Sequence, residues 1–141
     1  KLLIQMNPIL RKILAVILGI VVGSVVNMAL VSISGTVIPP PDGVDVTTAE
    51  GLKAGMHLFE PKHFIFPFLA HALGTFVGAL VAAWIAPSSK LTFAMVIAVF
   101  FFLGGLASIF MLPSPLWYTF VDLVFAYFPM AYFAKNIISK D

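Results

Sequence analysis

The sequence predicts an all-α integral membrane protein built from four transmembrane helices, and three observations predict this class. Of the 141 residues, 61% are hydrophobic and only 10% are charged, whereas a soluble domain is about half apolar and a quarter charged. The mean hydropathy is +1.08. The apolar residues fall into four runs, each close to the length of about 20 residues that a helix needs to cross a hydrocarbon core of about 30 Å.

The expected spans cover residues 9–33, 61–86, 91–112 and 115–135, and form a single transmembrane domain, 1–141. Backbone polar groups in lipid must be satisfied within their own segment, so each span is expected to be a helix. The first run is too long for the apolar part of a signal peptide and lacks a small-x-small cleavage site, which favours a span. Met6 opens "MNPILRK", a sequence suited to a natural start, which leaves open whether residues 1–5 are native.

The positive charges predict the orientation of the four spans. One side of a four-pass arrangement receives Lys1, Arg11, Lys12, Lys90, Lys135 and Lys140. The other side receives Lys53 and Lys62, beside Asp42, Asp45, Glu50 and Glu60. Because lysine and arginine accumulate on the cytoplasmic side, both termini are expected to be cytoplasmic and the loop 34–60 to face outward. Trp84, Trp117 and Tyr118 fall near span ends and fit interfacial aromatic belts.

The outer loop contains a candidate helix in "TTAEGLKAGMHLF". Thr47 as N-cap and Glu50 three residues later match a capping box. Leu52, Met56 and Phe59 recur at helical spacing and would form one apolar face. We expect a short amphipathic helix, on the membrane surface or over the mouth of the bundle. A plain connector is the alternative.

Two GxxxG motifs predict where helices pack closely. They are "GIVVG" and "GTFVG", with the candidate packing residues Gly19, Gly23, Gly74 and Gly78. Small residues at this spacing let two backbones approach. The first motif shares its helix face with Asn27, and the second shares its face with His71. Buried polar groups are therefore expected beside this contact.

Asn27, His71 and Asp122 form the candidate ligand or proton site. Asn27 lies seven residues from Ser34, His71 seven from Phe64 and Asp122 seven from Pro115, which puts all three roughly 10 Å below the outer edge. An ionised aspartate facing lipid costs at least about 2.5–3.5 kcal/mol, so Asp122 should face the bundle interior, with His71 as its partner. A purely structural role in locking the helices together is the alternative. Pro129 is expected to kink the fourth span.

The stretch "MHLFEPKH" stands above this site. His63 and Glu60 are expected at its entrance. His57, Glu60 and His63 recur every three residues, and imidazole with carboxylate suits a divalent metal such as zinc. Pro61 interrupts any continuous helix through all three residues. A solvated loop is therefore preferred to a metal site, and no cofactor is otherwise indicated.

The segments "LFEPKHFIFPFLAHALGT" and "MLPSPLWYTFVDLVFAYFPMAY" resemble those of small, uncharacterised four-helix bacterial inner-membrane proteins. The resemblance covers most of the chain from Met6. It implies a four-helix architecture and a location in the bacterial inner (cytoplasmic) membrane, and it implies no activity.

These observations favour a small membrane protein with an outward-opening polar pocket, which binds or transports a small solute or ion. A pathway through four helices is narrow, so an oligomer or a partner membrane subunit is expected alongside the lipid bilayer. One alternative is a membrane-embedded enzyme acting on an apolar substrate, with His71 as general base oriented by Asp122, with or without a metal at His57, Glu60 and His63. Another is a non-catalytic scaffold subunit. The absence of cysteine excludes thiolate chemistry, and the scattered basic residues make no patch for nucleic acid.

Overall fold

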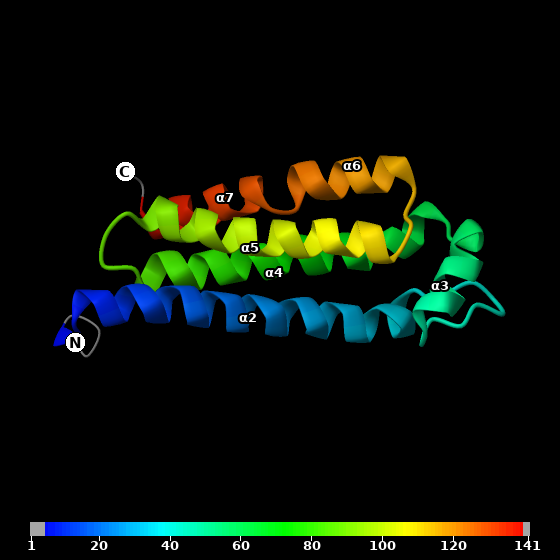
Figure 1. Cartoon of the computed structure of the whole chain (residues 1–141), viewed down its shortest axis with the longest axis horizontal. Helices are drawn as coiled ribbons and strands as arrows, with labels where there is room; N and C mark the ends of the chain where they lie inside the picture. The colour runs from blue at the N-terminus through cyan, green and yellow to red at the C-terminus, as the bar shows by residue number, and fades with distance from the viewer. Residues whose placement is uncertain (1–4, 140–141) are drawn as a thin grey trace.

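The computed structural model describes residues 5–139, and the regular secondary structure within that range is entirely helical (Figure 1). Lys1 and Lys140, which contribute to the expected orientation, lie outside the described residues. The segments long and apolar enough to cross a membrane are Pro8–Val37, Pro61–Ile85, Lys90–Met111 and Leu116–Ile138. The predicted all-α class, with four helical segments long and apolar enough to cross a membrane, is confirmed for the described residues.

The helices lie side by side along the long axis of the molecule (Figure 1). In chain order they are α2 (Pro8–Val37), α3 (Ala49–Gly55), the 3₁₀ turns η1 (Met56–Leu58) and η2 (Pro61–Phe64), α4 (Ile65–Ile85), α5 (Lys90–Met111), α6 (Leu116–Phe125) and α7 (Phe128–Ile138). Helix α2 begins and α7 ends at the same end of the bundle, whereas α3 lies at the opposite end (Figure 1). This opposite end, which carries residues 38–60, is called the loop end below.

Helices α2 and α4 touch backbone to backbone. A Cβ atom added to Gly23 would lie 2.6 Å from the carbonyl oxygen of Gly74, and one added to Gly78 would lie 2.6 Å from the carbonyl oxygen of Gly19. Such distances leave no room for a side chain, so the contact depends on glycine at these positions. All four glycines of the two GxxxG motifs lie at this contact.

The core beyond this contact is built largely from alanine. The fully buried alanines of α4, α5 and α7 include Ala79, Ala82, Ala94, Ala98, Ala131 and Ala134. Large apolar side chains such as Phe110 and Leu116 point outward instead and are 87% and 88% exposed. Small residues inside and large apolar residues outside are what close packing of helices in a lipid environment requires.

Arg11 ties the start of α2 to the end of α4. Its Nε and Nη2 atoms donate hydrogen bonds to the carbonyl oxygen of Ile85, at 3.1 and 2.8 Å. The last carbonyls of a helix lack partners within the helix and carry partial negative charge, so a guanidinium there stabilises the end of α4.

The fourth span is broken between α6 and α7. Pro129 lies in the first turn of α7 and has no N–H to bond the carbonyl of Phe125, against which its ring would also clash. The predicted kink is therefore present, but it lies in the turn before the proline, at Ala126 and Tyr127. Tyr127 leaves helical geometry there, with φ −119° and ψ −81°.

Two local predictions at the loop end were wrong. Helix α2 continues to Val37, one turn beyond the expected end at residue 33. Helix α3 is capped by Thr48, whose hydroxyl accepts from the Gly51 N–H, because Asp45 already binds the hydroxyl and amide of Thr47. The predicted capping box of Thr47 and Glu50 therefore does not form.

Candidate functional site

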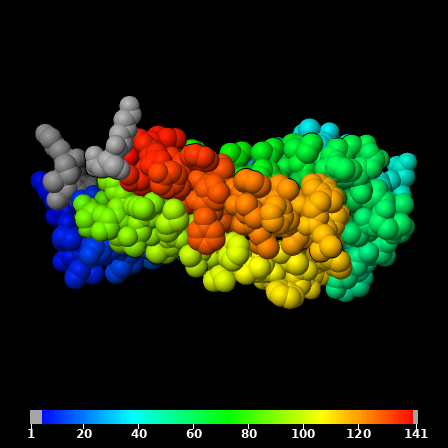
Figure 2. All heavy atoms as spheres, turned by 90° about the horizontal axis from the view of Figure 1, so that it is seen from above, coloured from blue at the N-terminus to red at the C-terminus, as the bar shows by residue number. Residues whose placement is uncertain are grey.

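A cavity of about 520 Å³ lies at the loop end of the bundle. Its walls come from the ends of α2, α4, α5 and α6, and Leu52, Met56 and Phe59 cover it from the loop. The apolar face predicted for the loop segment therefore faces the bundle. Figure 2 shows the loop closing this end of the molecule, beside α6 and the end of α5. The remaining lining includes Val31, Phe64, Phe66, Pro67, Ile109 and Leu112, with Ser32, Ser34, Ser108 and Ser114.

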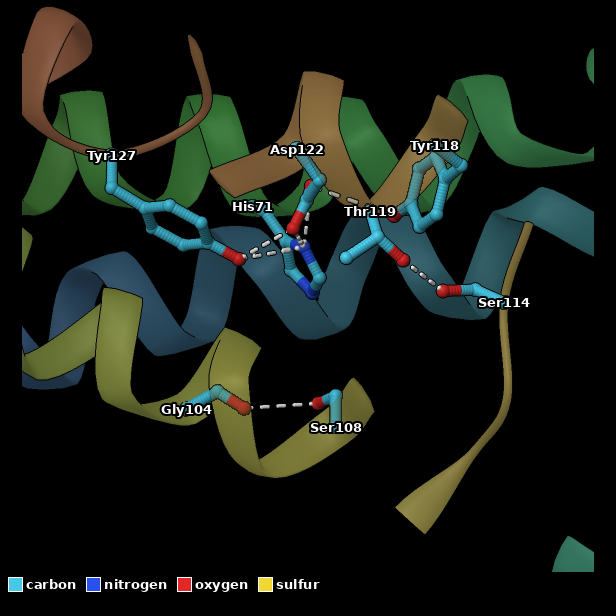
Figure 3. Close-up of polar contacts among 8 residues, drawn as sticks. All are labelled: His71, Gly104, Ser108, Ser114, Tyr118, Thr119, Asp122 and Tyr127. Carbon is cyan, nitrogen blue, oxygen red and sulfur yellow. Dashed lines mark hydrogen bonds and ion pairs between the residues drawn. The ribbon is translucent and has the colours of Figure 1, made fainter. Parts of the chain in front are cut away.

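His71 and Asp122 meet at the deep end of this cavity, and both line it. The Nδ1 atom of His71 lies 2.9 Å from Oδ1 and 3.0 Å from Oδ2 of Asp122 (Figure 3). The His71 side chain is 23% exposed and that of Asp122 only 4%. The contact expected from their common depth is thus formed, between α4 and α6.

Two tyrosines complete the shell around the carboxylate. The hydroxyl of Tyr127 donates to Oδ2 of Asp122 at 2.8 Å and lies 3.0 Å from Nδ1 of His71. The hydroxyl of Tyr118 donates to Oδ1 over a longer distance, 3.5 Å. Both tyrosines are buried. Within the described chain, Asp122 therefore receives its hydrogen bonds from one imidazole and two phenols, and from no lysine or arginine.

These contacts orient the imidazole of His71. A carboxylate only accepts hydrogen bonds, so the Nδ1 atom that faces it carries a proton. In the neutral ring, Nε2 then holds the free lone pair. Figure 3 shows Nε2 on the side of the ring away from Asp122, and it has no hydrogen-bond partner within residues 5–139. Nε2 is not fully buried, and the His71 side chain lines the cavity.

Gly105 makes room for Tyr127. A Cβ atom at Gly105 of α5 would collide with the hydroxyl oxygen of Tyr127, whereas a Cβ atom at the neighbouring Gly104 would meet nothing within 4 Å. The break before Pro129 turns the Tyr127 ring inward, and Gly105 leaves the space that the ring occupies. Both features are needed to bring the phenol to Asp122.

Asn27 does not join this group. It packs beside Gly74, where a Cβ atom of the glycine would lie 3.1 Å from Cβ of Asn27, and it does not line the cavity. The extra turn of α2 explains the difference, because it places Asn27 deeper than the span end at residue 33 predicts. Val31, one turn closer to the loop, lines the cavity with His71 instead.

Glu60 and His63 cap the start of the second span rather than forming a metal site. The Nδ1 atom of His63 accepts from the Glu60 N–H at 2.9 Å, and the Glu60 side chain accepts from the His63 N–H. No group of three His, Asp or Glu residues in the described part of the chain could hold a metal ion. His63 lines the cavity, as expected of a residue at the entrance, whereas Glu60 does not.

Sequence reasoning missed both tyrosines as site residues. Tyr118 had been placed in an interfacial belt, although its position four residues before Asp122 puts both side chains on one helix face. Tyr127 gave no comparable signal, because in an unbroken helix its side chain would point well away from Asp122. The one sequence signal for Tyr127 as a site residue is its position in the turn before Pro129, where the helix was expected to kink.

Comparisons of the chain with protein-family models, with curated proteins and with solved structures found no match. A function must therefore be argued from the side chains of the site.

Proposed function

We propose that the cavity binds a small amphipathic molecule. The polar group of that molecule would meet His71, and its apolar part would lie against the surrounding walls. One observation carries this proposal: Nε2 of His71 faces a largely apolar cavity and has no partner among the described residues, while Nδ1 is held by Asp122. Largely apolar walls with a few convergent polar groups are typical of small-molecule sites.

The arrangement favours a ligand site over a purely structural role. A polar group that only locks helices together should bond a neighbouring helix with all of its polar atoms. His71 bonds with one nitrogen and presents the other to a cavity of about 520 Å³. Ionisable groups at membrane depth that face an open space are functional candidates by default.

We place the loop end outside the membrane and both termini in the cytoplasm of a bacterium. Among the described residues Arg11, Lys12, Lys90 and Lys135 lie at or near helix ends remote from the loop, which supports this orientation. Below His71 the bundle is closed by the α2–α4 glycine contact and by buried alanines. Passage across the bilayer would require that packed half to open or a second subunit to contribute, so we assign binding as the primary function.

A matched pair of variants tests the binding site. Ile109 lines the cavity, whereas the adjacent Phe110 is 87% exposed on the outside of the same helix. We expect 4-phenylbutan-1-ol or 4-phenylbutylamine to raise the unfolding temperature of the protein in lipid nanodiscs. The Phe110→Trp variant should keep this response, and Ile109→Trp should lose it because the indole fills the cavity. Equal responses in both variants would place the site elsewhere.

General-base catalysis is a second candidate, favoured by the orientation of His71. Its Nε2 lone pair faces the cavity while Asp122 holds Nδ1, the arrangement in which an imidazole removes a proton from water. A neutral ester such as 4-phenylbutyl acetate would then be hydrolysed to the alcohol and acetate. Chromatography of the products measures the rate of hydrolysis, which should be higher for the wild-type protein than for His71→Ala. Equal rates in the two proteins would exclude His71 as the base.

A further inference from the structure

We infer that the ligand is a lipophilic amine, bound as its ammonium ion, and that it replaces the proton on His71. The site would then hold one positive charge at a time, either a proton on the imidazole or the ammonium of the ligand. This inference rests on the proposed binding function and names its ligand class.

The deep end of the cavity offers acceptors and few donors. The hydroxyl of Tyr127 donates to Asp122, and so does that of Tyr118. The hydroxyl of Ser108 donates to the carbonyl of Gly104 (Figure 3). With these donors occupied and Nδ1 bound to Asp122, the ring nitrogen left to contact a ligand is Nε2 of His71, which accepts through its lone pair. A ligand that donates a hydrogen bond fits this atom, and one that only accepts does not.

The charge of the cavity selects a cation over an anion. No lysine or arginine of residues 5–139 lines the cavity, whereas Asp122 does. A carboxylate or phosphate ligand would therefore be buried without a counter-ion, which is costly in a low-dielectric site. An ammonium on Nε2 of neutral His71 would be balanced by the carboxylate of Asp122 behind the ring.

The same balance makes the ammonium and the proton exclude one another. When His71 is protonated, it already neutralises Asp122, and an added ammonium would leave one uncompensated positive charge inside the bundle. Protonation also consumes the lone pair that the ammonium needs. The ionisable groups in contact with His71 are Asp122 from α6 and Tyr127 from the break. Tyr118 reaches Asp122, and His63 lines the same cavity. The ionisable side chains of α2 and α5 within the described residues are Arg11, Lys12 and Lys90, all at the end remote from the loop.

The walls and the loop end suit a cation as well. Phe59, Phe64 and Tyr118 line the cavity, and the ring centroids of Phe64 and Tyr118 lie 4.7 Å apart. Aromatic faces attract ammonium groups. Residues 38–62, which comprise the loop and the first residues of the second span, carry four acidic and two basic side chains, a net charge of −2 with histidine neutral. This negative loop end raises the local concentration of cations.

Four probes that share one carbon skeleton test the inference in nanodiscs by calorimetry. They are 4-phenylbutylamine, 4-phenylbutan-1-ol, 4-phenylbutanoate and the trimethylammonium analogue of the amine. At pH 8 the amine should bind at least tenfold more tightly than the alcohol, and the carboxylate should not bind. The quaternary analogue should bind more weakly than the amine, because it has no N–H to donate to Nε2.

The pH dependence tests the exchange itself. The amine stays charged between pH 8 and pH 5, so its own charge does not change over that range. At low pH, where a proton occupies Nε2, the affinity should fall by about tenfold for each further pH unit. Calorimetry in two buffers of different ionisation enthalpy should show close to one proton released for each amine bound at low pH. The His71→Gln variant keeps an amide near the position of Nε2 but cannot take up a proton there, so the tenfold fall per pH unit should disappear. His63→Gln, at the entrance of the cavity, should keep that fall.

The possible failures are distinguishable. If the alcohol or the carboxylate binds as tightly as the amine, or if amine binding releases no proton, the amine exchange is wrong and the binding function stands. If no probe binds and Ile109→Trp behaves like wild type, the proposed function itself fails. If His71→Gln does not fold, the probe series and the proton count on the wild-type protein still decide the matter.

Discussion

The hydroxyl of Tyr127 occupies the space that a Cβ atom at Gly105 would take. These two residues come from α5 and from the break in the fourth span, and their fit brings a phenol to Asp122 at 2.8 Å. The glycine is therefore part of the candidate site although it contributes no polar side-chain atom.

Replacing Gly105 by alanine should displace Tyr127 from Asp122. Overpacking of a buried contact costs about 1–3 kcal/mol, and the carboxylate would lose a hydrogen bond as well. Unfolding in mixed micelles, monitored by tryptophan fluorescence, should show the lower free energy of unfolding. Gly104→Ala is the control, because its added methyl group meets nothing within 4 Å. Equal stability of the two variants would contradict the fit described here.

The two tyrosines should differ in importance. Tyr127→Phe removes a donor 2.8 Å from a buried carboxylate and should destabilise the protein by about 1.5–3 kcal/mol. Tyr118→Phe removes a contact of 3.5 Å, long for a hydroxyl hydrogen bond, and should cost less than about 1 kcal/mol. The same unfolding measurement ranks the two, and a larger loss for Tyr118→Phe would be inconsistent with the geometry.

The contact between α2 and α4 should be sensitive to one methyl group. Gly23→Ala would push the two backbones apart, and we expect a loss of about 1–3 kcal/mol in unfolding free energy. Gly35→Ala lies on the same helix with open space around it, and it should be neutral or slightly stabilising. If Gly35→Ala were the more harmful change, the helices would have to pack through another face.

Thr75 is buried, and its Oγ1 atom has no hydrogen-bond partner within the described chain. Because an unsatisfied buried hydroxyl destabilises, the near-isosteric Thr75→Val should be neutral or stabilising by up to about 1 kcal/mol. Thr75→Ser keeps the hydroxyl, removes a methyl group and should destabilise. A marked loss of stability in Thr75→Val would reveal a partner for this hydroxyl.

The loop should titrate below the usual range of an aspartate. The hydroxyl of Thr47, its amide and the hydroxyl of Thr48 donate to Asp45 and lower its pKa below 3.8. Since the folded-state pKa is lowered, the hydrogen bonds from Thr47 and Thr48 to the Asp45 carboxylate stabilise the loop fully above pH 3.8. This stabilisation is lost as the pH falls through the lowered pKa of Asp45 in the folded protein. The NMR signal of the Thr47 amide should move at that pH in wild type and in Asp42→Asn, and should stay constant in Asp45→Asn. An inflection above 3.8 would refute this.

The packing motifs and the His71–Asp122 pair were predictable because regular helices preserve spacing. The glycines of "GIVVG" and "GTFVG" fall on one face of each helix, and two such faces pack together. The depth of His71 and Asp122 follows from the ends of α4 and α6, which lie close to where hydropathy predicts them. The same argument misplaced Asn27, because α2 continues for a turn past its apolar run.

The position of Tyr127 could not be predicted from helical periodicity. The break before Pro129 alters the direction of its side chain, and the resulting geometry depends on the space left by Gly105 on another helix. The cavity could not be predicted from helical periodicity either, because its walls come from four helices and the loop. Sequence spacing describes one helix at a time, whereas these features arise between helices.

The pairing of His71 with Asp122 also bears on how the protein is made. The two residues are separated by 51 positions. At a synthesis rate of about 5–20 residues per second, Asp122 is synthesised roughly 3–10 s after His71. During that interval the second span holds an ionisable ring without its partner in the bilayer. A nascent chain that stops before α6 would keep that defect, which gives membrane quality control a chemical feature by which to distinguish unfinished chains from complete ones.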